Sequence, residues 1–231
     1  MMHIGGLQKV SMIDYPGKLS AVLFLSGCNF HCPYCHNPDL AAGTAGARIA
    51  EGDVMAYLDA RRNLLEGVVI SGGEPTLQPE LPDLCRALKA RGYAVKLDTN
   101  GSLPEMLQTL IQDRLIDCIA MDVKTDPDRY APVLCAPDPA PAIKASIELI
   151  MRSGLPYEFR TTCFRPLISA MTMGRIASFI KGAKAYAIQK FYAKKTLDPD
   201  AGSTRDHFFD DNELWHLKAI AEPMVEYCFV R

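Results

Sequence analysis

Three cysteines lie close together near the N-terminus, at Cys28, Cys32 and Cys35. Three residues separate the first two and two residues separate the last two, so one short loop can present three thiolates to a cuboidal iron-sulfur unit. A 4Fe-4S cluster takes four ligands, and three cysteines leave one iron open to a ligand from outside the protein. The spacing therefore predicts a cluster that can bind a small molecule at its open iron.

A zinc site is the alternative interpretation of the same loop. Zinc would be held by the three cysteines together with His31 or His36. Such a site is expected to include a second pair of Cys or His residues at a compact distance, whereas the next cysteine is Cys85, in the apolar stripe of a predicted helix. The sequence favours iron and sulfide, and analysis of the bound metal distinguishes the two.

The elements that must position this loop follow a regular pattern. Short apolar runs alternate with amphipathic helical patterns, which is typical of a parallel sheet built from strand–helix units. The predicted strands lie at 19–26, 68–70, 94–98, 116–122, 157–162 and 187–192. The predicted helices lie at 54–65, 81–88, 103–111, 143–150, 173–180 and 211–221, and a polar loop over 196–205 and a last apolar run over 225–230 complete the chain. Six main strands are two short of a full (β/α)₈ barrel, so we expect an α/β fold in the form of a partial (β/α)₆ barrel, with parallel strands and outer helices.

The length and composition limit the class of protein. The chain has 231 residues, which favours a single domain over 1–231, with an N-terminal extension at 1–18, the partial barrel at 19–193 and a C-terminal loop, helix and terminal strand at 194–231. Its 25 Lys and Arg residues against 27 Asp and Glu residues offer no broad cationic surface for nucleic acid. The N-terminus has no signal-peptide pattern, and its apolar runs are too short to span a bilayer. We therefore expect a soluble cytoplasmic protein that binds neither nucleic acid nor membrane.

Polar and glycine-rich segments follow four successive predicted strands. They are Cys28, Gly72-Gly73-Glu74-Pro75, Asp98-Thr99-Asn100-Gly101, and Asp122 with Lys124. In a parallel α/β sheet these strand ends share one face, where ligands bind. Glycines let the backbone approach a ligand closely, and the Glu74 carboxylate can complement a bound ammonium. The sequence predicts a site assembled from four consecutive loops.

The chain resembles the radical S-adenosylmethionine (SAM) superfamily, whose signature is this Cys-x3-Cys-x2-Cys loop after the first strand of a partial barrel. The resemblance covers nearly the whole chain. The runs 14–17, 25–28, 34–38 and 72–75 are similar to those of the activating enzymes of glycyl radical enzymes. The likeness is greatest to the activating proteins of anaerobic ribonucleoside-triphosphate reductase, with the activators of pyruvate formate-lyase as near relatives.

The resemblance implies one 4Fe-4S cluster, held by Cys28, Cys32 and Cys35, whose open iron is chelated by the amino and carboxylate groups of SAM. An electron from the reduced cluster cleaves SAM, and the 5′-deoxyadenosyl radical abstracts a hydrogen from a glycine of the partner, a glycyl radical enzyme. No catalytic residue is implied beyond the cluster and SAM. A flavodoxin or ferredoxin is the expected electron donor. The alternative within the same fold is a radical enzyme for a small molecule, such as the deazapurine carboxylate synthase type.

Several residues match SAM-contacting positions of the relatives. Tyr34 and Asn37 match positions at the nucleoside end, although Tyr34 is equally well interpreted as an aromatic that shields the cluster. The tract that holds the methionine amino group corresponds to Gly72, Gly73 and Glu74.

Further polar positions near the ligand correspond to Asp98, Asp122 and Lys124, and Lys124 could pair with the ligand's carboxylate. In the relatives the corresponding acids also help to hold a monovalent cation, a role that would fall here to Asp98, Thr99 and Asp122. The alternative for these residues is an N-cap or turn carboxylate.

Arg160 and Tyr192 are two further candidates in later predicted strands. A charged residue in a strand that faces a barrel interior must be paired, so Arg160 makes either a polar contact in the active-site cavity or an ion pair with Glu158 or another strand acid. The relatives have a ligand-contacting histidine after the sixth strand, where this chain has 191–195, and Tyr192 is the candidate contact there.

The five remaining cysteines are predicted to be structural and to form no disulfide. Cys85, Cys118 and Cys163 are expected in the core, and Cys135 and Cys228 are candidates for exposure. Trp215 is expected to pack against its neighbours.

Overall fold

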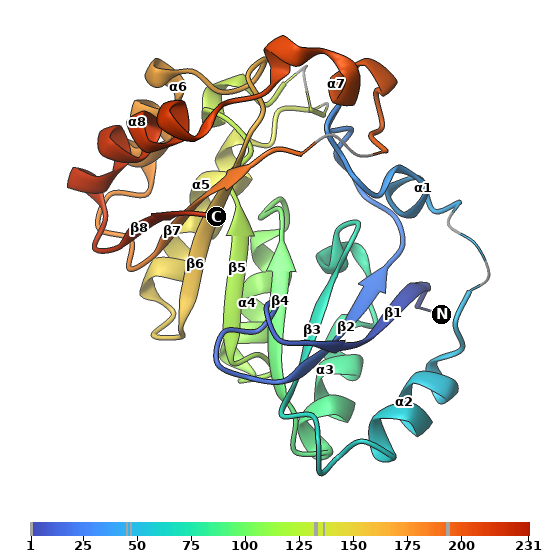
Figure 1. Cartoon of the computed structure of the whole chain (residues 1–231). Helices are drawn as coiled ribbons and strands as arrows, with labels where there is room; N and C mark the ends of the chain where they lie inside the picture. The colour runs from blue at the N-terminus through green and yellow to red at the C-terminus, as the bar shows by residue number, and fades with distance from the viewer. Residues whose placement is uncertain (1, 45, 47, 132–133, 136, 193–194) are drawn as a thin grey trace. The chain divides into compact units, whose positions relative to one another are not determined.

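A computed structural model of the chain describes residues 2–44, 46, 48–131, 134–135, 137–192 and 195–231 (Figure 1). The chain divides into two compact units, each drawn from several segments. The first unit comprises Met1–Asn29, Asp39–Thr99 and Glu105–Ile119, and the second comprises Phe30–Pro38, Asn100–Pro104 and Ala120–Arg231. The predicted boundary at 193 and 194 lies outside the described residues.

The first unit contains four strands that follow one another in the sheet as in the chain. They are β1 (Ile4–Ser11), β2 (Ser20–Leu25), β3 (Gly67–Gly72) and β4 (Ala94–Thr99). β2, β3 and β4 are parallel, and β1 pairs with β2 in the antiparallel direction. Strand β1 was not predicted within the extension at 1–18, because its sequence IGGLQKVS has no continuous apolar run, as befits an edge strand with a partly exposed face.

Helices connect these strands. They are α1 (Pro38–Ala41), α2 (Glu51–Asp59), η1 (Pro75–Leu77), α3 (Leu81–Ala90) and α4 (Pro104–Gln112), the first and last of which begin in segments of the second unit. Helix α3 packs on β4 and buries Leu81, Leu84, Cys85 and Leu88, the stripe that predicted it. Helix α2 ends at Asp59, earlier than predicted, and the chain continues in hydrogen-bonded turns.

The second unit contains parallel strands β6 (Tyr157–Cys163), β7 (Tyr186–Lys190) and β8 (Cys228–Val230), in that order. Strand β5 (Cys118–Asp122) is divided between the two units. The helices are η2 (Pro127–Arg129), α5 (Ala140–Arg152), α6 (Ala170–Phe179), α7 (Pro199–Ser203), η3 (Arg205–His207), α8 (Asp211–Ala221) and η4 (Glu222–Met224). Helix α8 packs on α6 and β8 (Figure 1). It begins where predicted, because Asp210 and Glu213 form a capping box.

The predicted polar loop over 196–205 is wrong in part, since it contains the short helix α7. The local signal was present: the Asp198 side chain accepts a hydrogen bond from the amide of Asp200, and Pro199 occupies the first helical position. The predicted terminal strand is confirmed as β8.

Alternating parallel strands and helices confirm the predicted α/β class, and in the described residues neither unit's sheet closes on itself. This agrees with a partial barrel. No helix within the described ranges is both long and apolar enough to cross a membrane.

The cysteines outside the loop are mostly in the core. Cys85, Cys118 and Cys163 are buried as predicted, and none of the eight cysteines, all of them described, is in a disulfide. Cys135 is half-buried, but Cys228 is buried, contrary to expectation, because β8 pairs with β7. The prediction for Trp215 is also wrong: its side chain is 58% exposed on α8 and lies beside the Lys218 ammonium.

Candidate active site

In the first unit, the loop that begins the three-cysteine segment lies against the end of β3. The amides of Gly73 and Glu74 donate to the carbonyls of Leu25 and Gly27, at 2.8 Å each. A Cβ added to Gly73 would lie 2.0 Å from the Gly27 oxygen, and Gly72 has φ +122 with no room for a side chain against Leu25. The two glycines therefore let the β3 end pack against the backbone that leads to Cys28.

Glu74 is buried and serves as the N-cap of η1. Its Oε1 accepts hydrogen bonds from the amide and hydroxyl of Thr76 and, at 2.7 Å, from the Thr99 hydroxyl. The carboxylate thus joins the ends of β3 and β4. This network fixes the orientation of Glu74, the acid that the sequence analysis predicted to lie beside the methionine amino group.

A buried ion pair lies on β4. The Lys96 ammonium donates to Oδ1 of Asp98, and the two side chains are 2% and 12% exposed. Asp98 was predicted near the ligand, whereas Lys96 was not singled out. The sequence did contain a signal for this pair, because a lysine two residues before an aspartate in a strand lies on the same face as that aspartate.

In the second unit, two distant segments hold the rest of the three-cysteine loop. The amides of Leu197 and Asp198 donate to the carbonyls of Cys35 and Pro33, at 3.1 and 3.0 Å. The amide of His31 donates to the Leu134 carbonyl at 2.8 Å. Backbone hydrogen bonds from segments far along the chain thereby hold the backbone around Cys32 and Cys35.

Tyr34 lies in this loop and is buried against two phenylalanines. Its ring centroid is 5.3 Å from that of Phe164 and 6.2 Å from that of Phe191. Burial raises the pKa of Tyr34 well above its ordinary value, so the phenol stays neutral. Among the described residues, its hydroxyl and that of Ser26 are the buried side-chain groups without a hydrogen-bond partner. Unsatisfied buried hydroxyls are costly, so both are suited to receive a ligand.

Three charged side chains form a compact group at the ends of β5 and β6. Asp122 binds Nε of Arg160 at 2.6 Å and Nζ of Lys124 at 2.7 Å, one through each carboxylate oxygen. Burial opposes the charge on Asp122, but the Arg160 and Lys124 charges outweigh it and hold the pKa of this carboxyl well below its usual range. Of the two roles predicted for Arg160, the structure shows the ion pair with a strand acid, which is Asp122. Glu158 pairs instead with Arg231.

Lys124 stays protonated in this group. Burial alone would lower its pKa, but the Asp122 charge outweighs burial, and Tyr34 and Cys32 add to it, so the pKa of Lys124 is raised well above its ordinary value. These interactions place the Lys124 charge within electrostatic range of the three-cysteine loop. The backbone amide of Lys124 also donates a hydrogen bond to the buried Tyr130 hydroxyl at 2.8 Å, which holds this part of the backbone in place.

Two of the predicted site residues are on the surface. Asn37 is exposed just before α1, and the Tyr192 side chain is 55% exposed while its carbonyl lies 3.2 Å from Nε2 of His36.

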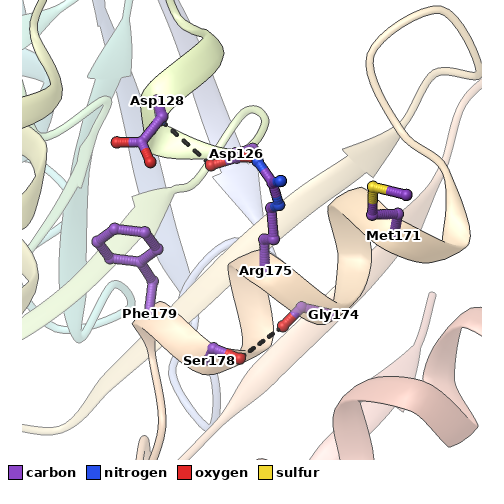
Figure 2. A pocket seen from close by; sticks show the side chains of 7 residues that line it. All are labelled: Asp126, Asp128, Met171, Gly174, Arg175, Ser178 and Phe179. Carbon is purple, nitrogen blue, oxygen red and sulfur yellow. Dashed lines mark hydrogen bonds and ion pairs between the residues drawn. The ribbon is translucent and has the colours of Figure 1, made fainter.

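A separate hollow of about 650 Å³ lies along α6 (Figure 2). Its lining residues are Asp126, Asp128, Met171, Gly174, Arg175, Ser178 and Phe179. The Arg175 guanidinium donates to the Asp126 carboxylate at 2.7 Å. Figure 2 shows the Arg175 side chain extending from α6 toward Asp126. No predicted site residue lines this hollow in the described part of the chain.

Comparison with known proteins identifies the fold family. The family model described as the Radical SAM superfamily matches residues 22–181. The chain belongs to this superfamily. Among curated proteins, a Methanocaldococcus jannaschii protein named as a glycyl-radical enzyme activating enzyme is 35% identical over 99% of this chain and 95% of its own length. This radical SAM enzyme is therefore a member of the glycyl-radical enzyme activating family.

Two further comparisons cover less of the matching proteins. The pyruvate formate-lyase-activating enzyme of Clostridium pasteurianum is 30% identical over 56% of each chain. The crystal structure of Streptococcus suis SuiB bound to precursor peptide SuiA superposes with a TM-score of 0.66 and 15% identity over 91% of this chain and 48% of that one. At this identity the likeness to SuiB concerns the fold alone.

The radical SAM family implies a 4Fe-4S cluster and SAM, and the residues present fit them. The donor set is three cysteine thiols in one loop, and the unsatisfied Ser26 and Tyr34 hydroxyls lie in the same stretch of sequence. No group of three His, Cys, Asp or Glu side chains in the described residues is arranged to hold a single metal ion. Of the loops predicted to form the site, the structure shows that the ends of β3 and β4 are joined through Glu74, and that Asp122, Lys124 and Arg160 form one group.

Proposed function

We propose that this enzyme installs a glycyl radical on anaerobic ribonucleoside-triphosphate reductase. The observation that carries the activating function is the 35% identity, over nearly the full length of both chains, to the protein named as a glycyl-radical enzyme activating enzyme. The choice of reductase rests on the sequence motifs 14–17, 25–28, 34–38 and 72–75. A pyruvate formate-lyase activator is the second candidate, favoured by the 30% identity to the Clostridium pasteurianum enzyme.

The proposed reaction consumes one electron, and a reduced flavodoxin or ferredoxin is the proposed electron donor. A 4Fe-4S cluster held by Cys28, Cys32 and Cys35 would supply that electron for the cleavage of SAM to methionine and a 5′-deoxyadenosyl radical. Transfer of one hydrogen atom from a glycine Cα of the partner then gives 5′-deoxyadenosine and the glycyl radical. No side chain of this protein has to gain or lose a proton.

The protein's own residues bind, orient and exclude water in this proposal. Cys28, Cys32 and Cys35 would hold the cluster. Lys124, kept protonated by Asp122, offers a fixed positive charge to the carboxylate of SAM. We propose that the buried Tyr34 ring forms an apolar wall and that its hydroxyl, which has no hydrogen-bond partner in the described residues, contacts the nucleoside end of SAM.

Gly72, Gly73 and Glu74 take a role that differs in part from the predicted one. Their backbone packs against the start of the three-cysteine loop, and Glu74 is held by Thr76 and Thr99. We propose that this tract positions both the Cys28 backbone and an acid for the methionine amino group. Asp98 and the exposed Asn37 remain proposed SAM contacts, and a cytoplasmic location remains a prediction.

The first test is anaerobic reconstitution with iron and sulfide, followed by dithionite and SAM. We expect about one cluster per chain and formation of 5′-deoxyadenosine, both abolished in Cys32→Ala. Cys135→Ala, which removes a half-buried cysteine outside the three-cysteine loop, is the matched control and should retain both. Zinc without iron or sulfide in the purified protein, or equal 5′-deoxyadenosine from Cys32→Ala, would refute the radical mechanism.

The second test identifies the partner. The reduced enzyme and SAM are incubated separately with purified anaerobic ribonucleoside-triphosphate reductase and with pyruvate formate-lyase, and the electron paramagnetic resonance spectrum is recorded. A glycyl doublet on the reductase supports the proposal, and a doublet only on pyruvate formate-lyase selects the second candidate. Turnover of a small molecule without any protein partner would overturn both.

A further inference from the structure

Lys96 is a buried cation at the centre of β4. Its Cα lies in register with Val69 of β3, which in turn lies in register with Val22 of β2, so the three side chains form one row on the same face of the sheet. Val22 and Val69 belong to an apolar cluster of the first unit. The lysine stem therefore lies over apolar neighbours, and only its ammonium meets an acid.

That acid is Asp98, two residues further toward the strand end on the same face. With the Lys96 side chain 2% exposed, water cannot solvate the ammonium, and the aspartate compensates its charge. A buried lysine at such a position is rare because its charge must be paired. The buried ion pair of Lys96 and Asp98 is therefore a specific structural feature of the end of β4.

The resemblance to other activators predicted a monovalent cation held by Asp98, Thr99 and Asp122, and the charges present here do not fit one. Asp98 already binds the Lys96 ammonium, and the Thr99 hydroxyl donates to Glu74. In the second unit, Asp122 already binds two cationic side chains. An added K⁺ or Na⁺ beside Asp98 would be repelled by an ammonium within hydrogen-bond distance of the same carboxylate.

We propose that the Lys96 ammonium is the built-in cation of this strand end and that the enzyme binds no monovalent metal ion there. The lysine supplies beside Asp98 the single positive charge that a bound K⁺ or Na⁺ would supply. Its covalent attachment makes that charge independent of the ionic composition of the cell. Asp98 belongs to the site of the proposed activating function, but the inference itself is based on the ion pair of Lys96 and Asp98.

The test is thermal unfolding of the full chain, purified anaerobically, with neither SAM nor partner added. Unfolding midpoints are compared in the chlorides of potassium, sodium and tetramethylammonium at equal ionic strength. We expect the wild type to unfold at the same temperature in all three salts. In Lys96→Met, which keeps an unbranched stem without the charge, a cation at ten times its Kd should raise the midpoint by about 3 to 6 °C relative to tetramethylammonium.

Lys89→Met is the matched control, because Lys89 also pairs with an aspartate of the first unit, Asp117, but both side chains are about one-third exposed. It should show no preference among the salts. An ion-specific shift in the wild type, or its absence in a folded Lys96→Met, would overturn the proposal.

If Lys96→Met does not fold, ²³Na magnetic resonance of the wild type decides. Broadening of the sodium line that K⁺ reverses would show a metal site and overturn the proposal, and an unbroadened line supports it. These measurements use neither SAM nor a glycyl radical enzyme, so their failure is distinguishable from failure of the proposed function, which is seen as missing 5′-deoxyadenosine.

Discussion

Replacement of Gly73 by alanine tests whether the end of β3 positions the three-cysteine loop. The new Cβ would lie 2.0 Å from the oxygen and 2.6 Å from the carbon of Gly27. Cβ atoms essentially never lie within 3.0 Å of such a neighbouring atom, so this carbonyl must move by about 1 Å. Because the obstacle is backbone, it cannot rotate away as a side chain would.

Overpacking of this kind costs about 1 to 3 kcal/mol, and in a chain of this size each kcal/mol lowers the unfolding midpoint by roughly 2 to 4 °C. We therefore expect Gly73→Ala to unfold about 2 to 12 °C below the wild type. Displacement of the backbone before Cys28 should also reduce the iron and sulfide bound per chain after reconstitution.

Gly52→Ala is the control for Gly73→Ala. Gly52 lies in α2 with open space around its Cα, so alanine there should be neutral or stabilising by about 0.5 to 1 kcal/mol. Midpoints are measured by circular dichroism, and iron and sulfide by chemical analysis. If Gly73→Ala unfolds at the wild-type temperature and binds a full cluster, the glycine pair does not position the loop.

Three further predictions concern stability and ligand binding. Asp122→Asn leaves the Arg160 and Lys124 charges without their carboxylate and should destabilise the protein by about 3 kcal/mol at pH 7, measured by urea unfolding. Since the pKa of Asp122 is depressed in the folded state, its contribution is complete above its ordinary pKa and declines as the pH falls, so an Asp122→Asn deficit that is the same at pH 7 and at pH 3 would contradict this assignment. Tyr34→Phe removes a buried hydroxyl without a partner in the described residues and should be neutral or stabilising by about 1 kcal/mol in thermal unfolding, while weakening SAM binding about tenfold by calorimetry; unchanged SAM affinity would identify the ring as a shield. Asp210→Ala removes the N-cap of α8 and should cost about 1 kcal/mol, seen as a lower urea midpoint, and an unchanged midpoint would show that the cap contributes nothing.

Local patterns in the sequence were sufficient for most elements of the fold. The stripe in α3 and the capping box at Asp210 specify helices through contacts within a few residues, which a sequence displays directly. The edge strand β1 was missed because a strand with a partly exposed face has no continuous apolar run. The helix α7 was missed although Asp198 and Pro199 provided its start signal.

The candidate site was predictable in its residue types but not in its pairings. Asp122, Lys124 and Asp98 were predicted as site residues, but Lys96, which pairs with Asp98 from two positions earlier in the same strand, was not singled out. Gly73 was assigned to a ligand, whereas its nearest neighbour is the backbone of Gly27, 46 positions away. Contacts between segments so distant in the chain leave no local trace.

The backbone of the three-cysteine loop is tied to Leu197 and Asp198, far along the chain. While the protein is being synthesised, all three cysteines leave the ribosome long before these residues exist. The loop lacks its two C-terminal hydrogen bonds until translation has passed Asp198. Iron-sulfur assembly machinery would thus meet an acceptor loop with both of these hydrogen bonds only after translation has passed Asp198.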